Sequence, residues 1–224
     1  MAEKYGVIPK KFTKEWWEYF WMYYKWYVIV AAAVIIAIVT TVYQVVTAPK
    51  YDVTFVYAGT TLYSEENVDA LEKKLSEIVS DVNGDGKKTV QVREMNFSLN
   101  SQNAEYAMSM EMKLQMALSE DETFIFMLDK DVVDRYKGDE ESPCIFAPLD
   151  DWMTVDVPEE KKLLSQDKAV AVELSGNKLL KECGIDATGK YLCMRFYPRS
   201  DQKRFIPGYE EAARIGSRIL KAWD

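Results

Sequence analysis

One short segment of the chain matches part of a metal-binding motif. Side-chain oxygens alternate at Asp81, Asn83 and Asp85, and Gly86 follows, as in the first half of a calcium loop of the form D-x-N-x-D-G. The match fails at the twelfth position, where Val92 stands in place of the bidentate glutamate. The pattern predicts weak calcium binding and points to no other cofactor. The alternative is a helix end followed by an Asp-Gly turn into a strand.

The residue types that most often carry out catalysis are scarce. The sequence contains no histidine, which removes the commonest general base and the commonest neutral metal ligand. Asp150 and Asp151 are adjacent, so on an extended segment their carboxylates would point to opposite faces and make a poor acid–base pair. The sequence also lacks a G-x-S-x-G motif and a phosphate-binding glycine loop. We therefore expect no enzyme activity.

The three cysteines do not have the spacing of a zinc site. Cys183 and Cys193 flank an expected turn at residues 184–190, and they could form a disulfide in an oxidising compartment. The alternative is that these cysteines, like Cys144, are buried free thiols.

The first half of the segment after residue 50 alternates between two kinds of pattern. Apolar residues typical of strands occur at 51–57, 89–97 and 123–128. Between them, apolar residues recur at three- and four-residue spacing over 64–82 and 103–119, which predicts two helices. A strand–helix–strand–helix–strand order predicts right-handed crossovers and a parallel sheet.

This arrangement predicts where a ligand would bind. In an open parallel sheet, ligands bind beyond the carboxyl ends of the strands. The candidate ligand-binding residues follow or end the three strands: Tyr57, Gly59, Thr60, Thr61, Asn96, Ser98 and Asp129.

The second half is less regular. Short strands are expected at 144–149, 169–174 and 191–197, a short helix at 177–182, and an amphipathic helix at 209–223. The predicted fold class is therefore α/β: one layered domain with a mainly parallel sheet, preceded by a membrane helix.

Methionines form a stripe on the predicted helix at 103–119. Met108, Met112 and Met116 are four residues apart and lie beside the apolar stripe that contains Leu114. We expect them in the core, because a helix in a layered domain can contact both the sheet and a neighbour. The alternative is an adaptable binding surface.

An uncharged segment near the N-terminus is long enough to span a membrane. No charged residue lies between Lys25 and Lys50, and residues 26–46 would extend roughly 31 Å as a helix, close to the hydrocarbon thickness of about 30 Å. Nine of the twelve residues 16–27 are aromatic, as expected for an interfacial belt. The belt either anchors the helix only or also forms a docking surface for another membrane protein.

The distribution of charge predicts the orientation. Residues 1–50 hold six of the 28 basic and three of the 36 acidic residues, so 22 basic and 33 acidic residues remain after them, a balance of −11. Lysines before the span predict that residues 1–25 are cytoplasmic, 26–47 transmembrane and 51–224 extracytoplasmic. The alternative interpretation of this segment is a signal peptide that is cleaved near Val46-Thr47-Ala48. The apolar run is, however, longer than the apolar run of such signal peptides. A domain with this negative charge repels phosphate backbones, which disfavours nucleic acid as a partner.

The order of the elements, with the segments MKLQMAL, TFIFML and FAPLDD, resembles the first lobe of extracellular solute-binding proteins over roughly residues 51–155. This resemblance implies a lobe of the periplasmic-binding-protein type. Members of that family close two lobes on a ligand, whereas residues 51–224 leave room for about one, so capture by lobe closure is not expected. The layout with its aromatic signal anchor also looks like membrane-anchored proteins of Gram-positive anaerobes.

Together these features predict a single-pass cell-membrane protein whose outer domain is a non-catalytic binding or interaction module, with a protein partner or a small solute. One alternative is a structural or assembly subunit that contacts its partners through the N-terminal aromatic helix. A second, disfavoured alternative is a cell-envelope enzyme.

Overall fold

The computed structural model describes residues 10–97, 104–139, 142–196 and 206–222. The chain forms two compact units, Met1–Pro49 and Lys50–Asp224.

The first unit contains one long helix, α1 (Lys14–Thr47). Thr13 caps its start, because the Thr13 hydroxyl accepts a hydrogen bond from the Trp16 amide at 3.3 Å. None of the residues Lys14–Thr47 is buried. The helix is long and apolar enough to cross a membrane, which confirms the prediction of a potential span. It also begins earlier than the predicted span, because the aromatic belt is itself helical.

The second unit is built on a six-stranded sheet in the order β2-β1-β3-β6-β5-β4. Strands β1 (Val53–Gly59), β2 (Val90–Asn96) and β3 (Thr123–Asp129) are parallel, as predicted. The other half is antiparallel. It consists of β4 (Lys162–Ser165), β5 (Lys168–Glu173) and β6 (Lys190–Met194). The fold is therefore α/β with a mixed sheet, in which four of the six strands run in one direction.

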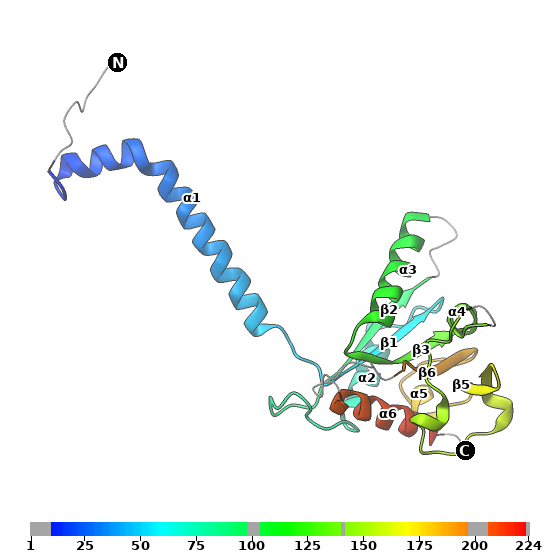
Figure 1. The fold of residues 1–224 in the computed structure, drawn as a ribbon. Helices are drawn as coiled ribbons and strands as arrows, with labels where there is room; N and C mark the ends of the chain where they lie inside the picture. Colours follow the sequence, from blue (N-terminus) through cyan, green and yellow to red (C-terminus); the bar gives the residue numbers. More distant parts are fainter. Residues whose placement is uncertain (1–9, 98–103, 140–141, 197–205, 223–224) are drawn as a thin grey trace. The chain divides into compact units, whose positions relative to one another are not determined.

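Helices cover both faces of this sheet (Figure 1). The first face packs against α2 (Glu65–Ser76), α5 (Lys178–Glu182) and α6 (Ile206–Leu220). The second face packs against α3 (Ala104–Ser119) and α4 (Lys130–Tyr136). The predicted cap of the first domain helix is confirmed, since the Ser64 hydroxyl accepts a hydrogen bond from the Asn67 amide at 3.3 Å.

The alternation of side chains along β3 explains why its sequence is continuously apolar. Ile125 and Met127 belong to the core between the sheet and α2 and α6, whereas Phe126 and Leu128 belong to the core under α3 and α4. A strand buried on both faces needs no polar positions.

The positions of Cys183 and Cys193 in the two cores keep these cysteines apart. Cys183 lies in the first core and Cys193 in the second, on the opposite face of the sheet. All three cysteines are free thiols, so the structure does not contain the disulfide considered from the sequence.

Three sequence expectations are wrong. The helix expected over 64–82 ends at Ser76, and residues 77–82 form turns and bends. Residues 144–149 do not form a strand, because only Phe146 makes an isolated bridge, to Arg195. The methionine stripe of α3 is not in the core: Met108, Met112 and Met116 are 68%, 52% and 62% exposed. The reason is that α3 contacts the sheet through its other side, where Leu114 is fully buried. Among the described residues, no second layer covers the side that carries the methionines.

Candidate functional site

The sheet brings most of the predicted ligand-binding residues together. Gly59 at the end of β1 is paired with Asn96 at the end of β2, and Ala58 is paired with Leu128 next to Asp129. Thr60 and Thr61 follow directly. Ser98 lies outside the described residues.

Asp129 is the centre of this group. Its Oδ2 atom accepts hydrogen bonds from the Thr60 amide and the Thr60 hydroxyl, both at 2.8 Å. Its Oδ1 atom lies 2.5 Å from Nζ of Lys190. Gly59 must be glycine here, because a Cβ at this position would overlap both the Asp129 carboxylate and the Tyr57 hydroxyl.

Lys190 is a member of the site that sequence reasoning missed. It is the first residue of β6 and is paired with Asp129 across the antiparallel β3–β6 ladder. Its Nζ donates a hydrogen bond to the Thr61 hydroxyl at 2.8 Å and lies 5.6 Å from the centre of the Tyr57 ring. No local pattern could reveal it, because its partner precedes it by 61 positions.

The Lys190–Asp129 ion pair is buried, with side chains only 6% and 14% exposed. Burial by itself lowers the pKa of the Lys190 ammonium, but the interactions with Asp129 and Tyr57 outweigh it, so this pKa is raised above its ordinary value. Lys190 is therefore charged at neutral pH, and its charge is neutralised within the domain.

Two tyrosines complete the group. The Tyr57 hydroxyl accepts a hydrogen bond from the Thr61 amide at 3.1 Å, and the rings of Tyr57 and Tyr63 lie 5.0 Å apart. The Tyr63 hydroxyl donates to the Asp186 carbonyl at 2.8 Å. Burial raises the pKa of both tyrosines. We call Tyr57, Thr60, Thr61, Asp129 and Lys190 the strand-end cluster.

The polar groups of the strand-end cluster are bonded mainly to one another. Asn96 joins it through a 3.2 Å hydrogen bond from its side-chain amide to the Thr61 carbonyl. Such a network holds the ends of β1, β3 and β6 together, which favours a structural role. Ligand binding at these residues stays a prediction.

The loop with the calcium-like pattern is folded around its own side chains. The Asp81 carboxylate accepts hydrogen bonds from the amides of Gly84 at 2.6 Å and Gly86 at 2.8 Å. Asn83 and Asp85 each accept a bond from the amide two residues later, both at 2.9 Å. Gly84 and Gly86 have φ of 74° and 82°, a region that favours glycine. In the described part of the chain, no three acidic, cysteine or histidine side chains gather as a metal site.

Calcium binding by this loop is nevertheless testable. The carboxylate oxygens of Asp81 and Asp85 and the amide oxygen of Asn83 each have a second lone pair, so these side chains can still contact a cation. With no bidentate glutamate, we expect a Kd of about 10⁻⁴ to 10⁻³ M. Titration calorimetry on residues 50–224 should give heat that is lost in Asp85→Ala. Absence of heat at millimolar calcium, or unchanged heat in the variant, would show that the loop is only a turn.

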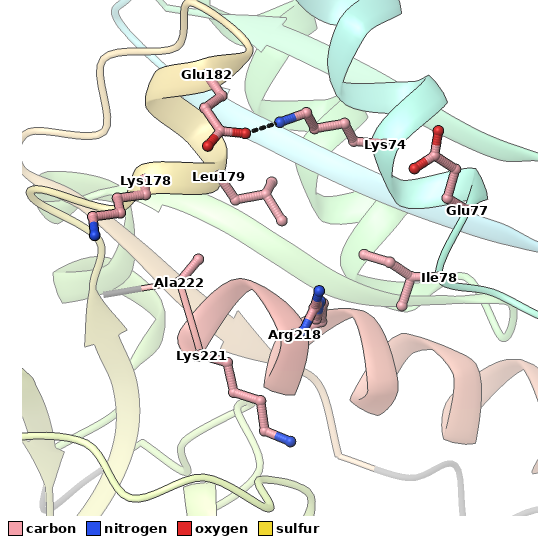
Figure 2. Close-up of a pocket in the computed structure, with 9 residues that line it drawn as sticks. All are labelled: Lys74, Glu77, Ile78, Lys178, Leu179, Glu182, Arg218, Lys221 and Ala222. Carbon is pink, nitrogen blue, oxygen red and sulfur yellow. Dashed lines mark hydrogen bonds and ion pairs between the residues drawn. The ribbon is translucent and has the colours of Figure 1, made fainter. Parts of the chain in front are cut away.

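A hollow of about 380 Å³ lies where α2, α5 and the end of α6 meet (Figure 2). Its apolar lining comes from Ile78, Leu179 and Ala222. Four basic and two acidic residues complete it: Lys74, Lys178, Arg218, Lys221, Glu77 and Glu182. Of these, Lys74 and Glu182 form an ion pair. The hollow is therefore positively charged in a domain with a balance of −11.

A second hollow, of about 580 Å³, lies beside the first and shares Ile78, Arg218 and Lys221 with it. Trp152 and Tyr209 add aromatic surface there. Neither hollow is lined by the strand-end cluster. The sequence carried no signal for the two hollows, because their lining residues come from four separate segments of the chain.

Comparison with known proteins assigns no relative. No family model, no curated protein and no solved structure matches the chain. The resemblance to a solute-binding lobe therefore stays a prediction, and the function has to be inferred from the chain itself.

Proposed function

We propose that this protein is anchored in the cell membrane by α1 and that its α/β domain is a non-catalytic interaction module outside the membrane, acting through a protein partner. The observation that carries the proposal is α1. A helix of 34 residues with no buried residue and with apolar side chains exposed along its length needs an apolar environment. A lipid bilayer supplies one.

The hydroxyl groups of α1 support a membrane environment. Thr40, Thr41 and Thr47 each donate a hydrogen bond of 2.7 to 2.9 Å to the carbonyl four residues earlier. A polar group in lipid must be satisfied inside the helix, and these three are. The orientation follows from the lysines before the span, which favour a cytoplasmic N-terminus.

A protein partner is favoured over a small solute for two reasons. The strand-end cluster, where a solute would be expected, is bonded internally. The exposed methionines of α3 instead offer an open apolar surface, which suits a macromolecule better than a small ligand.

A second candidate function is binding of a small anionic solute in the hollow of Figure 2. It is favoured by the side chains of Arg218 and Lys221, neither of which forms an ion pair with any described residue. Ile78 and Leu179 would cover the apolar part of such a solute.

Photo-crosslinking in native membranes tests the proposal. A photoreactive amino acid is placed at Met116 on α3, at Trp21 in the aromatic belt, or at the exposed control position Lys88. We expect strong crosslinks from Met116 and few from Lys88. Crosslinks from Trp21 alone would instead indicate an assembly subunit that uses its membrane helix, and equal yields from Met116 and Lys88 would contradict the proposal.

A further inference from the structure

The exposed side of α3 has a regular composition. A shallow hollow of about 310 Å³ runs along it, lined by Glu105, Met108, Ser109, Met112, Lys113 and Met116. We call these six residues the methionine face. They form two adjacent rows with a spacing of four residues, one of three methionines and one in the order Glu105, Ser109, Lys113.

The methionine face does not belong to the core of the domain. Core residues of the same helix, including Leu114 and Ala117, already fill the contact with the sheet. Three methionines more than half exposed on one face leave apolar, flexible surface in water, which is typical of a contact surface.

The charges of the second row are arranged symmetrically. Glu105 and Lys113 each lie four residues from Ser109, on opposite sides of it. If two copies of α3 pack antiparallel about a two-fold axis at Ser109, each Glu105 lies opposite Lys113 of the other copy. The small Ser109 side chains at the centre allow close approach, and Met108 and Met112 of the two helices interdigitate.

We infer that the methionine face is a homodimer contact in which two copies of this chain pair α3 with α3, antiparallel and centred on Ser109. The occupant is a second copy because the face is complementary to itself: reversing the helix exchanges its acidic and basic ends. Such an isologous contact is closed and forms dimers only.

This inference rests on the proposed membrane anchoring in one respect. One helix face is a small contact, and it would be weak between molecules free in solution. Two chains anchored in the same membrane have a much higher effective concentration, so a weak contact is sufficient.

The first test is site-specific crosslinking of the full chain. The protein is purified, reconstituted into proteoliposomes of neutral lipid and treated with a short bis-maleimide. In a Cys144→Ser background, Ser109→Cys should give a crosslinked dimer as the main product. Ser119→Cys is the matched control, because it is the same substitution on the same helix but ten residues from the two-fold centre. Equal yields at the two positions would overturn the inference.

The second test reverses the charges. In the Ser109→Cys background, Glu105→Lys or Lys113→Glu places like charges at both symmetric contacts and should lower the dimer yield about fivefold. The double reversal, Glu105→Lys with Lys113→Glu, restores opposite charges and should restore the yield. Lys113 is exposed, so the thermal midpoint of Lys113→Glu should match that of the parent, and a lower dimer yield in this variant then reports the contact itself. A double reversal that does not restore the dimer contradicts the antiparallel pairing.

The two proposals fail in different ways. If the chain sediments with membranes but does not crosslink through position 109, only the dimer contact is refuted. If the chain is soluble without detergent, the proposed anchoring is refuted, whatever the crosslinking shows.

Discussion

Replacing Asp129 with asparagine should lower the free energy of unfolding of the outer domain by about 3–5 kcal/mol. The variant keeps the size of the side chain but leaves the Lys190 ammonium buried without a counter-charge. Breaking a buried pair costs this much because the remaining charge cannot be solvated. Urea unfolding of residues 50–224, followed by circular dichroism, measures the change.

A matched control separates burial from charge. Asp134 and Lys137 form an ion pair at 2.6 Å, but their side chains are 37% and 33% exposed, so Asp134→Asn should cost less than about 1 kcal/mol. Replacing both buried partners, Asp129→Leu with Lys190→Met, should recover part of the loss. If Asp129→Asn costs no more than Asp134→Asn, the strand-end cluster is not the internal network described above.

The pH dependence of the Asp129 effect follows from the raised pKa of Lys190. A group whose pKa is higher in the folded state stabilises that state fully below its unfolded pKa, about 10.4 for lysine, and progressively less above it. The contribution of Lys190 to the stability of the wild type should therefore persist through neutral pH and shrink above about pH 10.4, which urea unfolding of residues 50–224 at a series of pH values measures.

Removing residues 1–49 should transfer the protein from the membrane fraction to the soluble fraction. The change removes all of α1, and the remaining unit has its own two cores. Sedimentation after alkaline carbonate extraction measures it: the full chain should pellet and residues 50–224 should not.

A second variant of α1 controls for the loss of chain length. Ile35→Arg with Val39→Arg keeps all residues but should cost about 2.5–3.5 kcal/mol per arginine at the centre of a span. This variant should also be released. A full-length chain that stays soluble, or an arginine variant that pellets like wild type, would contradict the anchoring.

Local patterns predicted the parallel half of the domain well. Strands β1, β2 and β3 lie within one or two residues of the expected segments, because each is a continuous or alternating apolar run. The strands of the antiparallel half were harder to predict from local patterns. Strand β4 has only four residues, and residues 144–149 have strand-like composition but pair at one position. Pairing there depends on tertiary contacts that no short window contains.

The same distinction applies to the candidate site. The rule for strand ends located Tyr57, Thr60 and Asp129 from the order of the elements alone. It could not locate Lys190, because the antiparallel register of β6 is nonlocal. The rule also could not predict that these residues bond to one another, since that depends on distances of a few ångströms.

The methionine stripe of α3 shows a further limit. Helical spacing revealed that Met108, Met112 and Met116 share a face, and it gave no information on whether another layer covers that face. The structure decides this, because α3 forms an outer layer of the domain. The alternative considered from the sequence, an adaptable surface, became the basis of the dimer contact.

Protease protection in intact cells tests the central claim most directly. The full chain carries one tag before residue 1 and a second after residue 224, and protease is added outside the cells. The proposed topology predicts that the C-terminal tag is lost while a fragment with the N-terminal tag and α1 is protected. Digestion of the N-terminal tag, protection of the C-terminal tag, or a mature protein that begins near Pro49 would contradict it.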